Sequence, residues 1–116
     1  MDSKETFSVI LRAVKILVSE KKIELYKECK FDVLKDTETT YRVIVEFNNC
    51  MGEILVTQPY FAPYRFVKIE ILSSDCIEDA HIFRWFDSEN DSVDEVLFQI
   101  CKCLDIAKNY NVPKDI

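Results

Sequence analysis

Apolar side chains recur every three to four residues near both ends of the chain. In residues 4–20 they form one stripe, which predicts an amphipathic helix. Its members are Phe7, Ile10, Leu11, Val14, Leu17 and Val18. Asp2 and Glu5 resemble a capping box at its start. A second stripe follows Ser92 and Glu95, which also fit a capping box, and predicts a helix that ends near residues 109–111.

Between these stretches the apolar positions alternate with polar ones, which is typical of strands with one buried face. The predicted strands span residues 23–33, 41–47, 53–58, 64–72 and 80–86, and the first is either one strand or two broken near Lys27. Gly52 is available for a positive φ in the hairpin of residues 48–52. The alternation places Phe66 with Lys68, and His81 with Trp85, on common faces of the sheet.

The order of helix, four or five strands and helix predicts one α+β domain over residues 1–116. Short turns join the strands, so we expect an antiparallel meander, because parallel strands need long crossovers. The two helices most economically cover one face of this sheet. The other face is then open to solvent or to a partner.

The composition excludes several functional classes. With one glycine, Gly52, the chain cannot form a glycine-rich phosphate loop. Arg12 and Lys15 interrupt the first apolar stretch, so we expect neither a signal peptide nor a membrane span. Five cysteines, an odd number, indicate reduced thiols and a cytoplasmic location.

The net charge of −6 lies entirely in the second part of the chain. Residues 75–95 hold eight carboxylates and one cation, Arg84. Such a field repels nucleic acid and anionic membranes and attracts a basic protein. The alternative is a solvated surface that promotes solubility.

No motif indicates catalysis, a cofactor or a metal site. Asp87, Glu89 and Asp91 match the first ligands of a calcium loop, but the glycine and the final glutamate of that loop are missing. Cys101 and Cys103 are spaced to point to different sides of a helix, with Cys103 the more buried. His81, the single histidine, has no nucleophile motif around it and fits a sheet face.

An aromatic segment at residues 58–67 is the least regular part of the chain. Pro59 and Pro63 prevent a central strand and favour an extended connection or an edge. Two interpretations stay open. The prolines hold one or two rings ready for a partner, or Phe61 and Tyr64 close the end of the core.

In its size, α+β order, acidic stretch and lack of a catalytic signature, the chain resembles the small acidic immunity proteins of bacterial toxin systems. The resemblance implies tight binding to a cognate, basic toxin domain, such as a nuclease, by occlusion of its active site. The residues that we expect to steer and anchor this partner are Asp75, Glu78, Asp79, Asp87, Glu89, Asp91, Tyr60, Tyr64 and Trp85. The alternatives are a secretion chaperone or adaptor, and a small-molecule binder or enzyme that uses His81 or a cysteine. The oligomeric state stays open.

Overall fold

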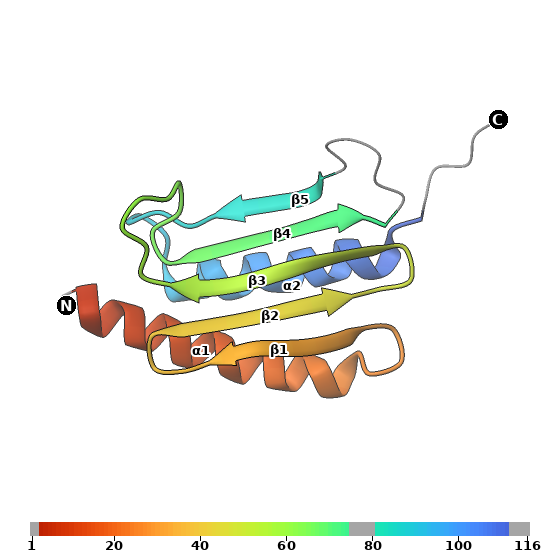
Figure 1. Ribbon diagram of the computed structural model, residues 1–116, viewed down its shortest axis with the longest axis horizontal. Helices are drawn as coiled ribbons and strands as arrows, with labels where there is room; N and C mark the ends of the chain where they lie inside the picture. Colours follow the sequence, from red (N-terminus) through yellow and green to blue (C-terminus); the bar gives the residue numbers. More distant parts are fainter. Residues whose placement is uncertain (1–2, 75–80, 112–116) are drawn as a thin grey trace.

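The computed structural model describes residues 3–74 and 81–111. A helix, five strands and a second helix follow one another along the chain (Figure 1). They are α1 (Ser3–Glu24), β1 (Lys30–Asp36), β2 (Thr40–Glu46), β3 (Cys50–Thr57), β4 (Val67–Ser73), β5 (His81–Phe86) and α2 (Val93–Asn109). The predicted α+β class is confirmed.

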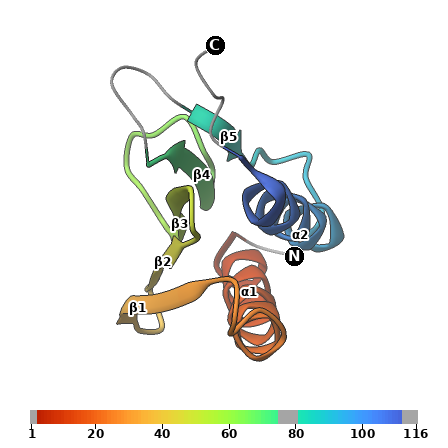
Figure 2. The same ribbon diagram turned by 90° about the vertical axis from the view of Figure 1, so that its right-hand side faces the viewer.

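The five strands form one antiparallel sheet in the order β1-β2-β3-β4-β5, so the predicted meander is also confirmed. Both helices lie on the same face of this sheet, and no element of the described chain covers the opposite face (Figure 2). Alternation decides which side chains turn inward, as in β2, where Tyr41, Val43 and Val45 are buried. They meet Ile10 and Val14 of α1 in one core.

The first helix is longer than predicted, and the strand predicted over residues 23–33 is wrong for residues 23–29, because β1 begins only at Lys30. Leu25 lies seven residues after Val18 and continues the buried stripe of α1. Its apolar side chain therefore fits the helical spacing as well as the alternation of the predicted strand. The Lys21 ammonium pairs with the Glu24 carboxylate at 3.0 Å in the last turn. The Cys29 amide then bonds to the Leu25 oxygen at 2.9 Å, and β1 begins one residue later.

The second helix begins as predicted. The Ser92 hydroxyl accepts a hydrogen bond from the Glu95 amide at 3.1 Å, and the helix ends at Asn109. Asp2, which we expected at the start of the first helix, lies outside the described residues. No helix in the described chain is both long and apolar enough to cross a membrane.

Gly52 does not occupy the β2–β3 turn as predicted. It lies inside β3 opposite Val45, while the Phe47 amide closes the hairpin on the Cys50 oxygen at 2.8 Å. A Cβ at position 52 would collide with the backbone oxygen of Glu70 and with Ile71 on the neighbouring strand. The glycine is therefore required for a close approach of β3 and β4, and not for a positive φ.

Two face assignments from the alternation are wrong. Strand β4 begins only at Val67, so Phe66 escapes the alternation and packs edge-on against Phe7 of α1, with ring centroids 5.2 Å apart. The pairing of β4 with β5 shifts by one residue beside Ile71, because β5 contains one extra, unpaired residue at this point. This irregularity turns His81 away from the core and onto the open face.

Candidate interaction surface

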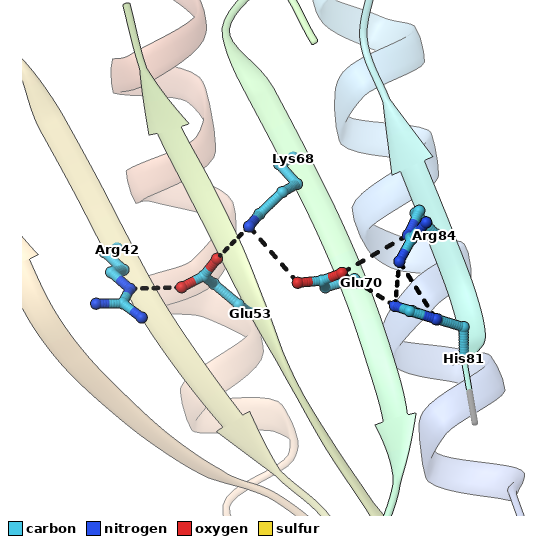
Figure 3. Close-up of polar contacts among 6 residues, drawn as sticks. All are labelled: Arg42, Glu53, Lys68, Glu70, His81 and Arg84. Atoms are coloured by element: carbon cyan, nitrogen blue, oxygen red, sulfur yellow. Dashed lines mark hydrogen bonds and ion pairs between the residues drawn. The ribbon is translucent and has the colours of Figure 1, made fainter. Parts of the chain in front are cut away.

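Six polar side chains cross the open face of the sheet from β2 to β5. We call this set the charge ladder (Figure 3). Its members are Arg42, Glu53, Lys68, Glu70, His81 and Arg84. They project from the face that the helices leave uncovered. Glu53 lies between cations of the two neighbouring strands, and Glu70 lies between Lys68 of its own strand and Arg84 of β5.

The contacts of the charge ladder run without a break across the four strands. Glu53 accepts from Arg42, and its second oxygen lies 3.0 Å from the Lys68 ammonium. Lys68 is also 3.5 Å from Glu70, which lies 3.7 Å from the Arg84 guanidinium. The three cations and two carboxylates leave little unbalanced charge on this face. The ladder therefore ties strands together and places paired charges across an uncovered sheet face.

Glu53 is the least exposed carboxylate of the charge ladder. Its side chain is 12% exposed, and burial alone would raise its pKa. Hydrogen bonds from Arg42 and Lys68 outweigh burial, so the pKa of Glu53 lies below its usual value. Burial would lower the pKa of Lys68, yet its bond to Glu53 and the nearby Glu70 raise it. Both groups are therefore held in their charged forms at neutral pH.

His81 belongs to the charge ladder. Its Nε2 lies 3.3 Å from the Glu70 carboxylate, and Arg84 approaches both ring nitrogens. The side chain is 26% exposed on a flat sheet face. A histidine held between a carboxylate and a guanidinium serves a structural network, so this geometry does not favour the alternative in which His81 is a catalytic base.

The second feature is the connection between β3 and β4, residues 58–66, which we call the aromatic loop. Tyr60 is 99% exposed and Phe61 98% exposed, so the interpretation that Phe61 closes the core is wrong. Tyr64 is half-buried and contacts Phe86 with ring centroids 5.9 Å apart. Phe66 takes the place in the core. Two adjacent rings therefore stand free in solvent, where they bury none of their apolar surface.

Asp87 fixes the base of the aromatic loop. Its Oδ1 accepts hydrogen bonds from the Phe66 and Val67 amides, each at 2.8 Å. Its own backbone bonds to Arg65 and Val67 at 3.0 and 3.1 Å. The carboxylate is fully buried, and its other oxygen lies 3.8 Å from the Arg65 Nε. The prediction that Asp87 steers a partner from the surface is therefore wrong, because this acid is an internal clamp.

The other predicted contact residues divide into three groups. Glu89 is exposed, whereas Asp91 is half-buried and accepts from the Ser88 amide at 2.7 Å. Trp85 is half-buried and packs against the core opposite Ile69, so only part of its ring is accessible. The remaining acids, Asp75, Glu78 and Asp79, lie outside the described residues.

The described cysteines are free thiols. Cys29, Cys50 and Cys103 are buried and Cys101 is half-buried, in agreement with the prediction that Cys103 is the more buried of the two α2 cysteines. Burial raises the pKa of Cys29 to about 12 and also raises the pKa of Cys103. These two thiols are therefore protonated and inert at neutral pH.

Candidate metal ligands are dispersed over the part of the chain that the structure describes. No group of three or more His, Cys, Asp or Glu side chains there could hold a metal ion. Comparisons with protein-family models, with curated proteins and with solved structures found no match.

The charge ladder and the exposed Phe61 were missed in the sequence. The ladder left a signal, since its charged members occupy the outward positions of successive strands, but reading it requires the strand register. The exposure of Phe61 left no such signal. Phe61 and Phe66 are both apolar rings near one end of the sheet, and the sequence does not show which of the two enters the core.

Proposed function

We propose that this protein is a non-enzymatic binding module that docks a protein partner through the aromatic loop. The observation that carries the proposal is the nearly complete exposure of Tyr60 and Phe61 beside each other. Burying an aromatic side chain contributes about 1.5–3 kcal/mol, so covering both rings would contribute about 3–6 kcal/mol. Aromatic anchors of this kind dominate the energetics of protein interfaces.

The loop is suited to binding because its base is already ordered. Asp87 fixes the last residue of the loop and the residue after it, and Pro59 and Pro63 restrict the backbone within the loop. Less conformational entropy is then lost when a partner covers the rings. An aromatic loop without a clamp would lose part of its binding energy to ordering.

We further propose that the partner is a toxin domain and that the protein is an immunity protein acting by occlusion in the cytoplasm. The support is the resemblance in size, α+β order and acidity. Among the acids predicted to steer a basic partner, Glu89 and Asp91 are the two described ones that are not fully buried. Trp85 and Tyr64 would flank the docked surface. Asp87 has no part in steering, since it is the clamp.

Co-expression tests both parts of the proposal. The toxin domain to use is one encoded beside this chain, and the expected result is survival of the cells and co-purification of the two proteins. Replacing Tyr60 and Phe61 together by alanine should abolish both effects. Tyr26→Ala is the matched control, because Tyr26 is 71% exposed in the α1–β1 turn at the opposite end of the molecule (Figure 1).

The outcomes separate the role from the binding surface. Full protection by the double variant, with its fold intact, would exclude the aromatic loop as the docking site. Cell death despite co-expression with the neighbouring toxin would exclude the immunity role. If the native chain and the Tyr26→Ala control protect the cells and the double variant does not, the result supports occlusion of the toxin through the aromatic loop.

A further inference from the structure

A cleft of about 620 Å³ lies at the end of the molecule that also carries the aromatic loop. One wall is the N-terminal half of α1, and the other is formed by the β1–β2 turn and by Gln58, where the aromatic loop begins. Its volume falls within the range of small-ligand sites in proteins. The cleft is distinct from the charge ladder, which lies on the other side of the sheet.

The floor of the cleft is apolar and its walls carry charge. Phe7 and Leu11 line it from α1 with buried side chains, 3% and 6% exposed. Lys4 and Arg12 rise beside them, and Glu38 is the one carboxylate of the lining. A ligand in the cleft would therefore meet an apolar surface and positive charge at the same time.

The cations of the cleft differ in whether they are already paired. The Lys15 ammonium lies 2.7 Å from the Asp36 carboxylate and donates to the Thr37 oxygen at 2.9 Å, so it is neutralised. With the described residues, Lys4 and Arg12 make neither an ion pair nor a side-chain hydrogen bond. Two unpaired cations in a chain of net charge −6 form a local field that favours an anion.

We propose that this cleft binds a carboxylate carried on an apolar group. The carboxylate pairs with Arg12, whose planar guanidinium can donate two parallel hydrogen bonds, and with Lys4. The apolar group lies on the floor over Phe7 and Leu11, which are themselves only 3% and 6% exposed, and contacts the aliphatic stems of Lys4 and Arg12. Glu38 on the facing wall disfavours ligands with more than one negative charge, which selects a monocarboxylate over a phosphate ester.

Two sources could supply this chemistry, a free organic acid and the C-terminus of a polypeptide. The free-acid probe is 3-phenylpropionate, and the peptide probe is glycyl-glycyl-phenylalanine with a free carboxylate. Each has a matched analogue without the negative charge, 3-phenylpropionamide and the peptide amide. None of these probes requires the partner of the proposed function, so failure here leaves that function standing.

Binding is measured by two-dimensional amide NMR on the full chain. We expect saturable shifts at Phe7, Leu11 and Thr39 with a carboxylate probe, and not with its matched analogue. Shifts with the free acid alone identify a small-molecule site, and stronger shifts with the peptide acid identify a C-terminus. Either result supports the proposal.

Variants test the assigned cations. Lys4→Gln together with Arg12→Gln should weaken binding of the carboxylate probe at least about tenfold, which corresponds to the loss of one charge-assisted contact. The control is Lys102→Gln with Lys108→Gln, which removes the same charge from exposed positions of α2. Equal shifts with charged and uncharged probes, equal weakening in both variants, or the absence of saturable shifts would each overturn the proposal.

Discussion

Replacing Asp87 by alanine should cost more stability than removing any other acid in the described part of residues 81–111. The substitution leaves the Phe66 and Val67 amides without the carboxylate that now accepts from both at 2.8 Å. A buried donor without a partner costs about 1–3 kcal/mol, so two cost about 2–6 kcal/mol, and water entering the site lowers that sum. We expect a loss of about 3 kcal/mol in the free energy of unfolding.

Asp87→Asn is a finer version of the same test. The amide oxygen can still accept from both backbone amides, but its NH₂ group then faces the Arg65 Nε, which is also a donor and lies 3.8 Å from the present carboxylate oxygen. The expected loss is smaller, about 1–2 kcal/mol.

Urea denaturation followed by circular dichroism measures both losses, with Glu89→Ala as the exposed control that should change stability by less than about 0.5 kcal/mol. Hydrogen exchange gives a local readout, because the Phe66 and Val67 amides should lose protection before the rest of the sheet. If Asp87→Ala costs less than about 1 kcal/mol, or if these amides stay protected, Asp87 is not the clamp described here.

Three further predictions concern the sheet and the core. Gly52→Ala should destabilise the protein by about 2–4 kcal/mol in urea denaturation, because the added methyl group meets the Glu70 backbone. That backbone cannot move aside without breaking the backbone hydrogen bonds between β3 and β4. An unchanged midpoint would contradict the required close approach. The pKa of Glu53 is lowered on folding, so its charge stabilises the folded state above the ordinary glutamate pKa, and this contribution disappears as the pH falls through the lowered value. Glu53→Gln should therefore reduce the free energy of unfolding at neutral pH, and the difference from the native chain should shrink in acid; a difference independent of pH would refute the assignment. Burial raises the pKa of the Cys29 and Cys103 thiols, so mass spectrometry should find both unmodified after iodoacetamide treatment of the folded protein and modified after treatment in urea.

Local patterns were sufficient for the elements whose partners lie nearby in the chain. The alternation over residues 41–47 predicted β2, whose Tyr41, Val43 and Val45 form one buried row, and the capping pair of Ser92 and Glu95 predicted the start of α2. These features depend on the periods of strand and helix and on one short hydrogen bond. The antiparallel order followed from the short turns alone.

The errors arose where a distant contact decides the outcome. Gly52 was assigned to a turn because glycine is common in turns. Its actual role depends on its closeness to the backbone oxygen of Glu70 on the neighbouring strand, which the local sequence does not show. His81 changed face because of an irregularity in pairing that the alternation of β5 does not encode. Asp87 is clamped to amides 20 and 21 residues earlier. The residues that follow it are polar or acidic, so it was assigned to the surface with them.

The positions of exposed rings and unpaired charges indicate which surface of this molecule is the more favourable one for binding. On the open face of the sheet, the charges of Glu53 and Glu70 are compensated by neighbouring strands, so a partner would have to break those pairs before using them. At the other site, two rings stand free on the aromatic loop, and Lys4 and Arg12 stand unpaired within the described residues beside an apolar floor. A partner or ligand gains contacts there without first losing any. The large flat face is therefore the less favourable surface for binding, and the narrow end of the molecule is the more favourable one.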